Sequence, residues 1–107
     1  MAKYLLEVNY TVSGITGVMS EGGAARVAAA KALIESAGGT MESFYFAFGA
    51  TDVYVIAEFP DNASAAAAAL TVAAGGGATS RTVVLLSAEE VDAAVAKETT
   101  YRPPGGS

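Results

Sequence analysis

Two glutamates are the first residues in this 107-residue chain whose type and spacing could do chemistry. Glu7 lies in the alternating run 4–10, and Glu58 lies in a similar run, 53–59. If the runs are antiparallel neighbours with Glu7 near Ile56, the two carboxylates lie diagonally on one sheet face, about 7–8 Å apart. Such a pair could act as acid and base or hold a hard cation. Alternatively, each carboxylate is solvated or pairs with a cation of a partner subunit.

Three more polar side chains, Asn9, Tyr45 and Tyr54, are candidates for the same pocket or interface as the two glutamates. A tyrosine combines a large apolar ring with a hydroxyl group that needs a hydrogen-bond partner. This combination suits a core or subunit interface, and it also suits the wall of a pocket that holds an aromatic substrate.

The four residues 49–52 separate two apolar runs and contain Gly49 and Asp52. Glycine tolerates positive φ, and an aspartate side chain accepts hydrogen bonds from nearby backbone N–H groups. We therefore interpret Gly49 and Asp52 as turn residues, with a place at a pocket rim as the alternative.

Gly22 and Gly23 precede a helical pattern that has Arg26 in its first turn. An anion could bind at such a helix N-terminus. The spacing matches neither a P-loop nor a dinucleotide-binding motif, so a kink or close packing is the alternative.

The composition excludes several kinds of chemistry. The chain has no Cys and no His, which removes disulfides, thiol nucleophiles, imidazole bases and the usual zinc and haem ligands. We therefore expect no metal and no cofactor. The net charge is −5, and the six basic residues are scattered, so we expect no nucleic-acid binding. No apolar run is long enough to cross a membrane, and no signal peptide precedes the first strand, so a cytoplasmic location is expected.

The periodicity of the apolar residues predicts the elements that position these side chains. Alternation or β-branched composition predicts strands over 4–10, 40–48, 53–59 and 82–86. Helical spacing predicts a short turn within 13–23 with a kink at Gly22-Gly23, and helices over 24–37, 63–74 and 88–97. In the helix 24–37, Arg26 is expected to lie away from the buried face. Asp61 or Asn62, and a Ser87-x-x-Glu90 capping box, are expected to begin the last two helices.

The order β-α-β-β-α-β-α predicts an α+β, ferredoxin-like βαββαβ fold with an extra short C-terminal helix. The expected sheet has four antiparallel strands, with the first and third in the centre and the helices on one face. Residues 1–98 form the single predicted domain, and 99–107 form an extended tail rich in Pro and Gly. One sheet face is left uncovered, with Leu5, Glu7, Asn9, Tyr54, Ile56 and Glu58 on it. The strand 40–48 adds aromatic residues to this face, either Tyr45 or the three phenylalanines Phe44, Phe46 and Phe48. Because this surface is apolar, we expect it to be covered by a second copy of the chain, making a homo-oligomer.

The chain resembles the GYD domain family, which consists of small bacterial proteins grouped with the dimeric α/β-barrel superfamily. The resemblance rests on the segments YLLEVNYTVSGITGVMSEGGAARV, GGTMESFYFAFGATDVYVIAEFPD and RTVVLLSAEEVDAA, and on the tail YRPPG. Thr51 stands where the Gly-x-Tyr-Asp turn of the family has its tyrosine. The resemblance implies a ferredoxin-like fold and dimers that pack sheet against sheet, and it implies no reaction.

Three functions follow as hypotheses. The first is a small oligomeric binding or structural module without a catalytic constellation. The second, implied by superfamily relatives that are cofactor-free monooxygenases, is an enzyme or small-molecule-binding protein with a pocket between subunits. The third is a regulatory trimer that binds ligands in its subunit clefts.

Overall fold

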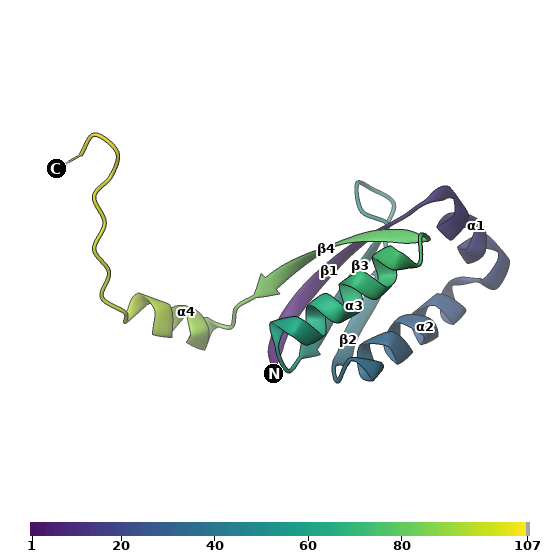
Figure 1. The fold of residues 1–107 in the computed structure, drawn as a ribbon, viewed down its shortest axis with the longest axis horizontal. Coiled ribbons are helices and arrows are strands. Elements are labelled where there is room, and N and C mark those ends of the chain that lie inside the picture. Colours follow the sequence, from purple (N-terminus) through teal and green to yellow (C-terminus); the bar gives the residue numbers. More distant parts are fainter. Residues whose placement is uncertain (107) are drawn as a thin grey trace.

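The computed structural model describes residues 1–106, and its strands form one antiparallel sheet in the order β2-β3-β1-β4 (Figure 1). This arrangement confirms the predicted ferredoxin-like α+β fold, with the first and third strands in the centre. The elements along the chain are β1 (Ala2–Tyr10), α1 (Val12–Glu21), α2 (Gly23–Ser36), β2 (Thr40–Phe46), β3 (Val53–Phe59), α3 (Asn62–Ala74), β4 (Ala78–Leu85) and α4 (Ala88–Val95).

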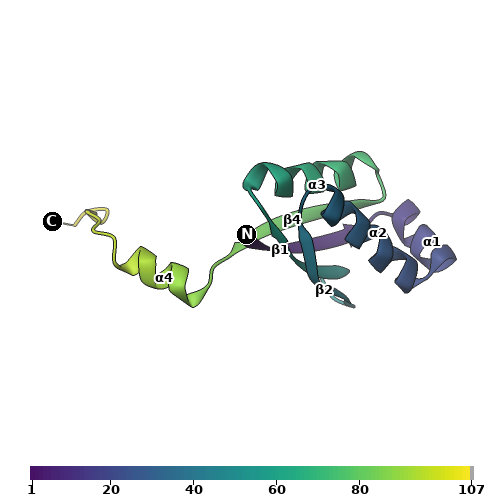
Figure 2. The same cartoon turned by 90° about the horizontal axis from the view of Figure 1, so that it is seen from below.

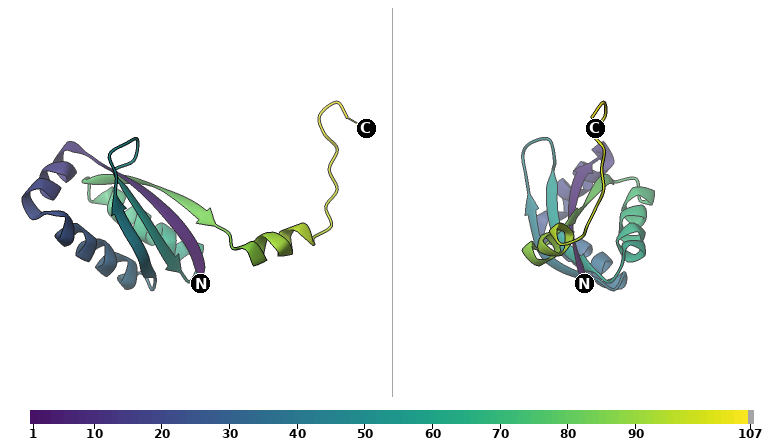
Figure 3. Two further views of the ribbon diagram at one scale, coloured as in Figure 1. Left: turned by 180° about the vertical axis from the view of Figure 1, so that it is seen from behind. Right: turned by 90° about the vertical axis from the view of Figure 1, so that its left-hand side faces the viewer.

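Two helices cover one face of the sheet. Helix α2 packs along β2, and α3 packs along β4 and β3. Figure 2 shows both helices on the same side of the strands, and the left view of Figure 3 looks at the sheet from the other side, with α3 behind it. The other face of the sheet is open, as the sequence predicts.

The core lies between the sheet and these helices. Alternate residues of β3, from Val53 to Phe59, are at most 3% exposed. The rings of Tyr4 and Phe59 meet edge to face, with centroids 5.7 Å apart. The helices contribute mainly Ile34 and two alanines, Ala65 and Ala68. The alternation in the sequence therefore assigns the buried face of β3 correctly.

The connection from β1 to β2 contains two helices rather than one turn and one helix. Thr11 caps α1 by accepting a hydrogen bond from the Gly14 N–H, and α1 continues for ten residues despite its two glycines. Gly22 then adopts a φ of 86°, which is strained for residues with a side chain. The predicted kink is confirmed, but the preceding helix is longer than predicted because a capped, packed helix overrides low intrinsic propensity.

The predicted caps of the last two helices are confirmed. Asp61 accepts a hydrogen bond from the Ser64 N–H at 2.7 Å, and Ser87 and Glu90 form a complete capping box. Strand β4 begins four residues earlier than predicted. Three of the four added residues, Thr79, Ser80 and Arg81, are polar, but they pair with the second half of β1. This pairing could not be predicted from their own composition.

The C-terminal segment from Leu86 onward, which we call the arm, extends away from the rest of the chain (Figure 1). Every residue of α4 is exposed. The radius of gyration is 17.2 Å, whereas a compact domain of this length has about 13 Å. The predicted tail, 99–107, belongs to this arm, and its last residue, Ser107, lies outside the described residues.

Candidate functional site

The open side of the sheet, which we call the free face, carries side chains from all four strands. The register places Tyr45 opposite Tyr54, and Leu5 opposite both Ile56 and Val83. Polar and charged side chains of the same register alternate with these groups. The free face consists of Lys3, Leu5, Glu7, Asn9, Thr40, Ser43, Tyr45, Tyr54, Ile56, Glu58, Thr79, Arg81, Val83 and Leu85.

The predicted pair of carboxylates does not form. Glu7 and Glu58 share the free face, but Glu7 is paired with Tyr54 and Glu58 with Lys3. The two glutamates are therefore four residues apart along the strands, or about 13 Å. The expected register was wrong by two residues, a shift that keeps every side chain on its predicted face. Acid–base catalysis or cation binding shared by these two carboxylates is thereby excluded in the protomer.

Each of the two glutamates instead has a basic residue of its own chain nearby. The Glu7 carboxylate lies 3.8 Å from the Arg81 guanidinium. Glu58 is paired in register with Lys3, whose ammonium group lies 3.0 Å from a third glutamate, Glu42. A hydrogen bond to Glu42 raises the pKa of Lys3, as do the charges of Glu42 and then of Glu58. The charges of the free face are therefore balanced locally.

The two tyrosines form the most exposed aromatic surface of the free face. Tyr45 is 70% exposed and Tyr54 is 38% exposed, although they are direct neighbours across β2 and β3. Leu5 and Ile56 lie beside them and are only half-buried. The best-formed pockets within residues 1–106 are lined by residues of other regions. In the protomer the free face is thus a surface for packing rather than a closed binding pocket.

Asn9 and Asp52 hold the chain together where β1 ends and β3 begins. The Tyr10 N–H donates to the Asp52 carboxylate at 2.9 Å, and the Asp52 N–H donates both to the Val8 carbonyl oxygen and to the Asn9 amide oxygen. The Asp52 side chain therefore bonds to a neighbouring strand rather than to its own turn. Asn9 has a structural partner, which weakens its assignment to a ligand pocket.

Gly49 does not use its freedom to adopt positive φ. The glycines with positive φ among residues 1–106 are Gly22, Gly38, Gly76 and Gly105. A Cβ atom at Gly49 would meet no atom within 4 Å. The predicted reason for Gly49 was therefore wrong: the turn is closed by the hydrogen bond from the Ala47 N–H to the Asp52 carbonyl oxygen.

Thr51 is 2% exposed and is the only polar residue within 1–106 that is fully buried. The tyrosine that the family places here is much larger than threonine. In this chain a tyrosine at position 51 would have to displace packed neighbours or point out of the turn. The departure from the family motif is thus accompanied by close packing around the smaller side chain.

Sequence reasoning missed a cavity on the helix-covered side of the sheet. Its volume is about 110 Å³, and its walls are almost entirely apolar. It forms because the helices facing Leu6, Val8 and Val55 carry alanines, whose small side chains do not fill the space between helix and sheet. The alanine-rich helical faces were the signal, but their distance from the sheet could not be read from composition.

Arg26 lies in the wall of this cavity, contrary to the expectation that it faces away from the core. Its side chain is 37% exposed, and its guanidinium lies 3.5 Å from the Glu21 carboxylate, across the kink at Gly22. Close packing explains Gly23, because a Cβ atom there would lie 3.1 Å from the Phe46 ring. The glycine pair therefore lets α2 approach the sheet and brings Arg26 over the cavity.

Residues 1–106 contain no group of three or more acidic side chains placed to hold a metal ion, and none of their helices is long and apolar enough to cross a membrane.

The fold and the open sheet define a ferredoxin-like α+β protein. The sequence pattern of the GYD domain matches residues 4–95, and the chain belongs to this family. The searches of curated proteins and of solved structures returned no significant match.

Proposed function

We propose that this protein is a homo-oligomeric binding or structural module that assembles through its free face. The observation that carries the proposal is the composition of that face. Leu5, Ile56, Val83 and two tyrosines form one continuous apolar surface across four strands, with paired charges around it. Subunit interfaces have this character, with aromatic residues in the centre and polar groups at the rim.

The exposed area of the protomer supports the same proposal. A compact monomer of 10.7 kDa exposes about 5,500 Å², whereas this protomer exposes 7082 Å². The difference of about 1,600 Å² is a large area for one protomer, in the range of extensive, permanent interfaces. We expect a second copy of the chain to cover this excess area at the free face and along the arm.

The arm gives a second argument for a partner. Helix α4 has only eight residues, and an isolated helix of fewer than about 12–15 residues is marginal in water. Its capping box stabilises one end, but Val91 and Val95 are exposed along it, as is Leu86 just before it. We therefore expect the arm to pack against a second copy.

Two adjacent residues of β4 provide a matched test. Val83 is on the free face and Val84 is on the opposite face, and they are 41% and 55% exposed. In sedimentation velocity, the unaltered chain and Val84→Lys are expected to be oligomers, and Val83→Lys is expected to shift toward the monomer. A monomeric unaltered chain, or equal effects of the two lysines, would contradict assembly through the free face.

A further inference from the structure

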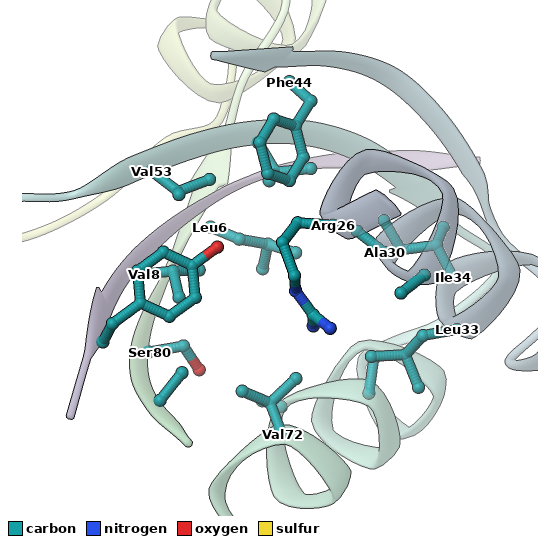
Figure 4. A pocket seen from close by; sticks show the side chains of 16 residues that line it. Leu6, Val8, Arg26, Ala30, Leu33, Ile34, Phe44, Val53, Val72 and Ser80 are labelled. Atoms are coloured by element: carbon teal, nitrogen blue, oxygen red, sulfur yellow. The ribbon is translucent and has the colours of Figure 1, made fainter. Parts of the chain in front are cut away.

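The cavity beneath the helices combines an apolar interior with one cation, and neither feature depends on the free face. Leu6, Val8, Val53 and Val55 form its floor on the sheet, and helices α2 and α3 form its roof. Figure 4 shows the Arg26 side chain extending from α2 into the space between Val72 and Leu33. The side chain is 37% exposed, so the guanidinium lies at the edge of the apolar cavity, where it contacts water and could also contact an anionic ligand.

The guanidinium of Arg26 has donors to spare. Arginine carries five N–H donors in a planar fork, and the contact with Glu21 is a single long one of 3.5 Å. A carboxylate can accept two parallel hydrogen bonds from this fork. The hydroxyl-bearing side chains of Tyr10 and Ser80 also line the cavity. The wall of the cavity is thus apolar except for these three side chains.

The cavity continues outward into a groove that opens to solvent. The groove has a volume of about 420 Å³ and shares Tyr10, Arg26, Leu33 and Val72 with the cavity. A ligand can therefore enter with its charged group near Arg26 and its apolar part toward the sheet. The shared residues place the cation at the junction of the two spaces.

We propose that this cavity binds a small monocarboxylate with a short aliphatic tail. The volume of about 110 Å³ is somewhat below that of an engineered 150 Å³ apolar cavity that binds benzene, so it suits a tail of about four to five carbon atoms. Glu21 beside the guanidinium favours a ligand with one negative charge, because a doubly charged phosphate would be repelled more strongly. A site of this kind makes the protein a carrier or sensor of short carboxylic acids.

The binding test uses sodium pentanoate as the probe and pentan-1-ol as its uncharged counterpart. Pentanoate is expected to shift the methyl resonances of Val8, Val55 and Val72 in a carbon–proton spectrum. Over the series from propanoate to pentanoate, affinity is expected to rise about fourfold for each methylene group, and then to stop rising when the tail exceeds the cavity. Pentan-1-ol is expected to bind more weakly.

Substitutions distinguish the contribution of the Arg26 charge to binding from the contribution of the apolar cavity. Arg26→Gln is expected to weaken pentanoate binding at least about tenfold and leave pentan-1-ol binding unchanged. Lys31→Gln, which removes an exposed cation of the same helix, is the control for net charge. Ala30→Leu fills the cavity and is expected to abolish binding of both probes, whereas Ala28→Leu on the exposed side of α2 leaves it intact.

Three results would overturn the proposal: no shift with pentanoate up to its solubility limit, equal affinity for pentanoate and pentan-1-ol, or full binding by a folded Ala30→Leu protein. The sedimentation experiment above is independent of all three, because Val83 lies on the opposite face of the sheet. The assembly and the carboxylate site can therefore fail separately.

Discussion

The two faces of the sheet are built on opposite principles, and β3 shows both in seven residues. On the helix-covered side, Val53, Val55, Ala57 and Phe59 are almost completely buried. On the free face, Tyr54 is exposed, and Ile56 and Glu58 are half-buried. The same strand thus provides the centre of the core and part of an open surface.

This difference teaches which side stabilises the protomer and which is available to a partner. The covered face holds the rings of Tyr4 and Phe59 under alanine-rich helices, and it leaves a cavity of about 110 Å³. The free face has two tyrosines and charged side chains but no cover. Because the helices contribute mostly alanine, whose burial removes little apolar area, the protomer alone is expected to be only modestly stable. Assembly through the free face would add to that stability.

The difference between the two faces is tested most directly at Phe59 and Tyr45, one aromatic residue from each face of the sheet. Phe59→Ala is expected to lower the free energy of unfolding by about 3–5 kcal/mol, because the ring is fully buried and leaves a cavity. Tyr45→Ala is expected to change it by less than about 0.5 kcal/mol in the monomer, because the ring is 70% exposed. Urea unfolding at a concentration where both variants sediment as monomers measures the two values. Similar losses would mean that the two faces contribute equally to the protomer.

A smaller effect is expected at Asp52, where the ends of β1 and β3 are joined. Asp52→Ala leaves the Tyr10 N–H without its acceptor and is expected to cost about 1–3 kcal/mol. Asp52→Asn keeps an oxygen acceptor at the same place and is expected to cost less. Gly49→Ala in the same turn is the control, because its Cβ atom would meet nothing within 4 Å. If Gly49→Ala proved as damaging as Asp52→Ala in urea unfolding, the turn itself would be the critical feature.

The sequence was sufficient to predict that Glu7 and Glu58 share a face of the sheet, but it did not predict the register between their strands. Alternation places Glu7 and Glu58 on one face in both the predicted and the observed register, because the two differ by two residues and such a shift preserves the face. The actual register depends on bonds between distant residues, such as that from the Tyr10 N–H to Asp52. Such bonds leave no periodic trace in the sequence, so the predicted carboxylate pair was wrong although both residues were placed on the correct face.

The cavity and the position of Arg26 could not be predicted for a different reason. The helical periodicity of α2 indicates which side is apolar, but it does not give the depth at which the helix packs. Gly23 lets α2 approach Phe46 closely, and this approach brings a residue at the edge of the apolar face over the cavity. A small difference in packing thus decides whether Arg26 is a surface charge or part of a pocket wall.

The smallest expected effect compares the pH dependence of one charged group from each side. The hydrogen bonds from Ser64 hold the pKa of Asp61 below its usual 3.8, so this cap stabilises the fold above pH 3.8 and its contribution is lost as pH falls through the lowered pKa. The hydrogen bond to Glu42 and the nearby carboxylate charges raise the pKa of Lys3 above 10.5, so its contribution is present below pH 10.5 and is lost as pH rises through the raised pKa.

Thermal unfolding across pH separates these two groups, and each variant serves as the control for the other. Asp61→Asn is expected to weaken the fall in melting temperature at acidic pH and leave the alkaline side unchanged. Lys3→Met is expected to do the reverse. Both shifts are expected to be small, because the two side chains are exposed and solvent screens their interactions. If Lys3→Met also altered the melting temperature at acidic pH, Lys3 would interact with carboxylates of the free face other than Glu42. The interpretation that the charges on that face are paired locally would then be wrong.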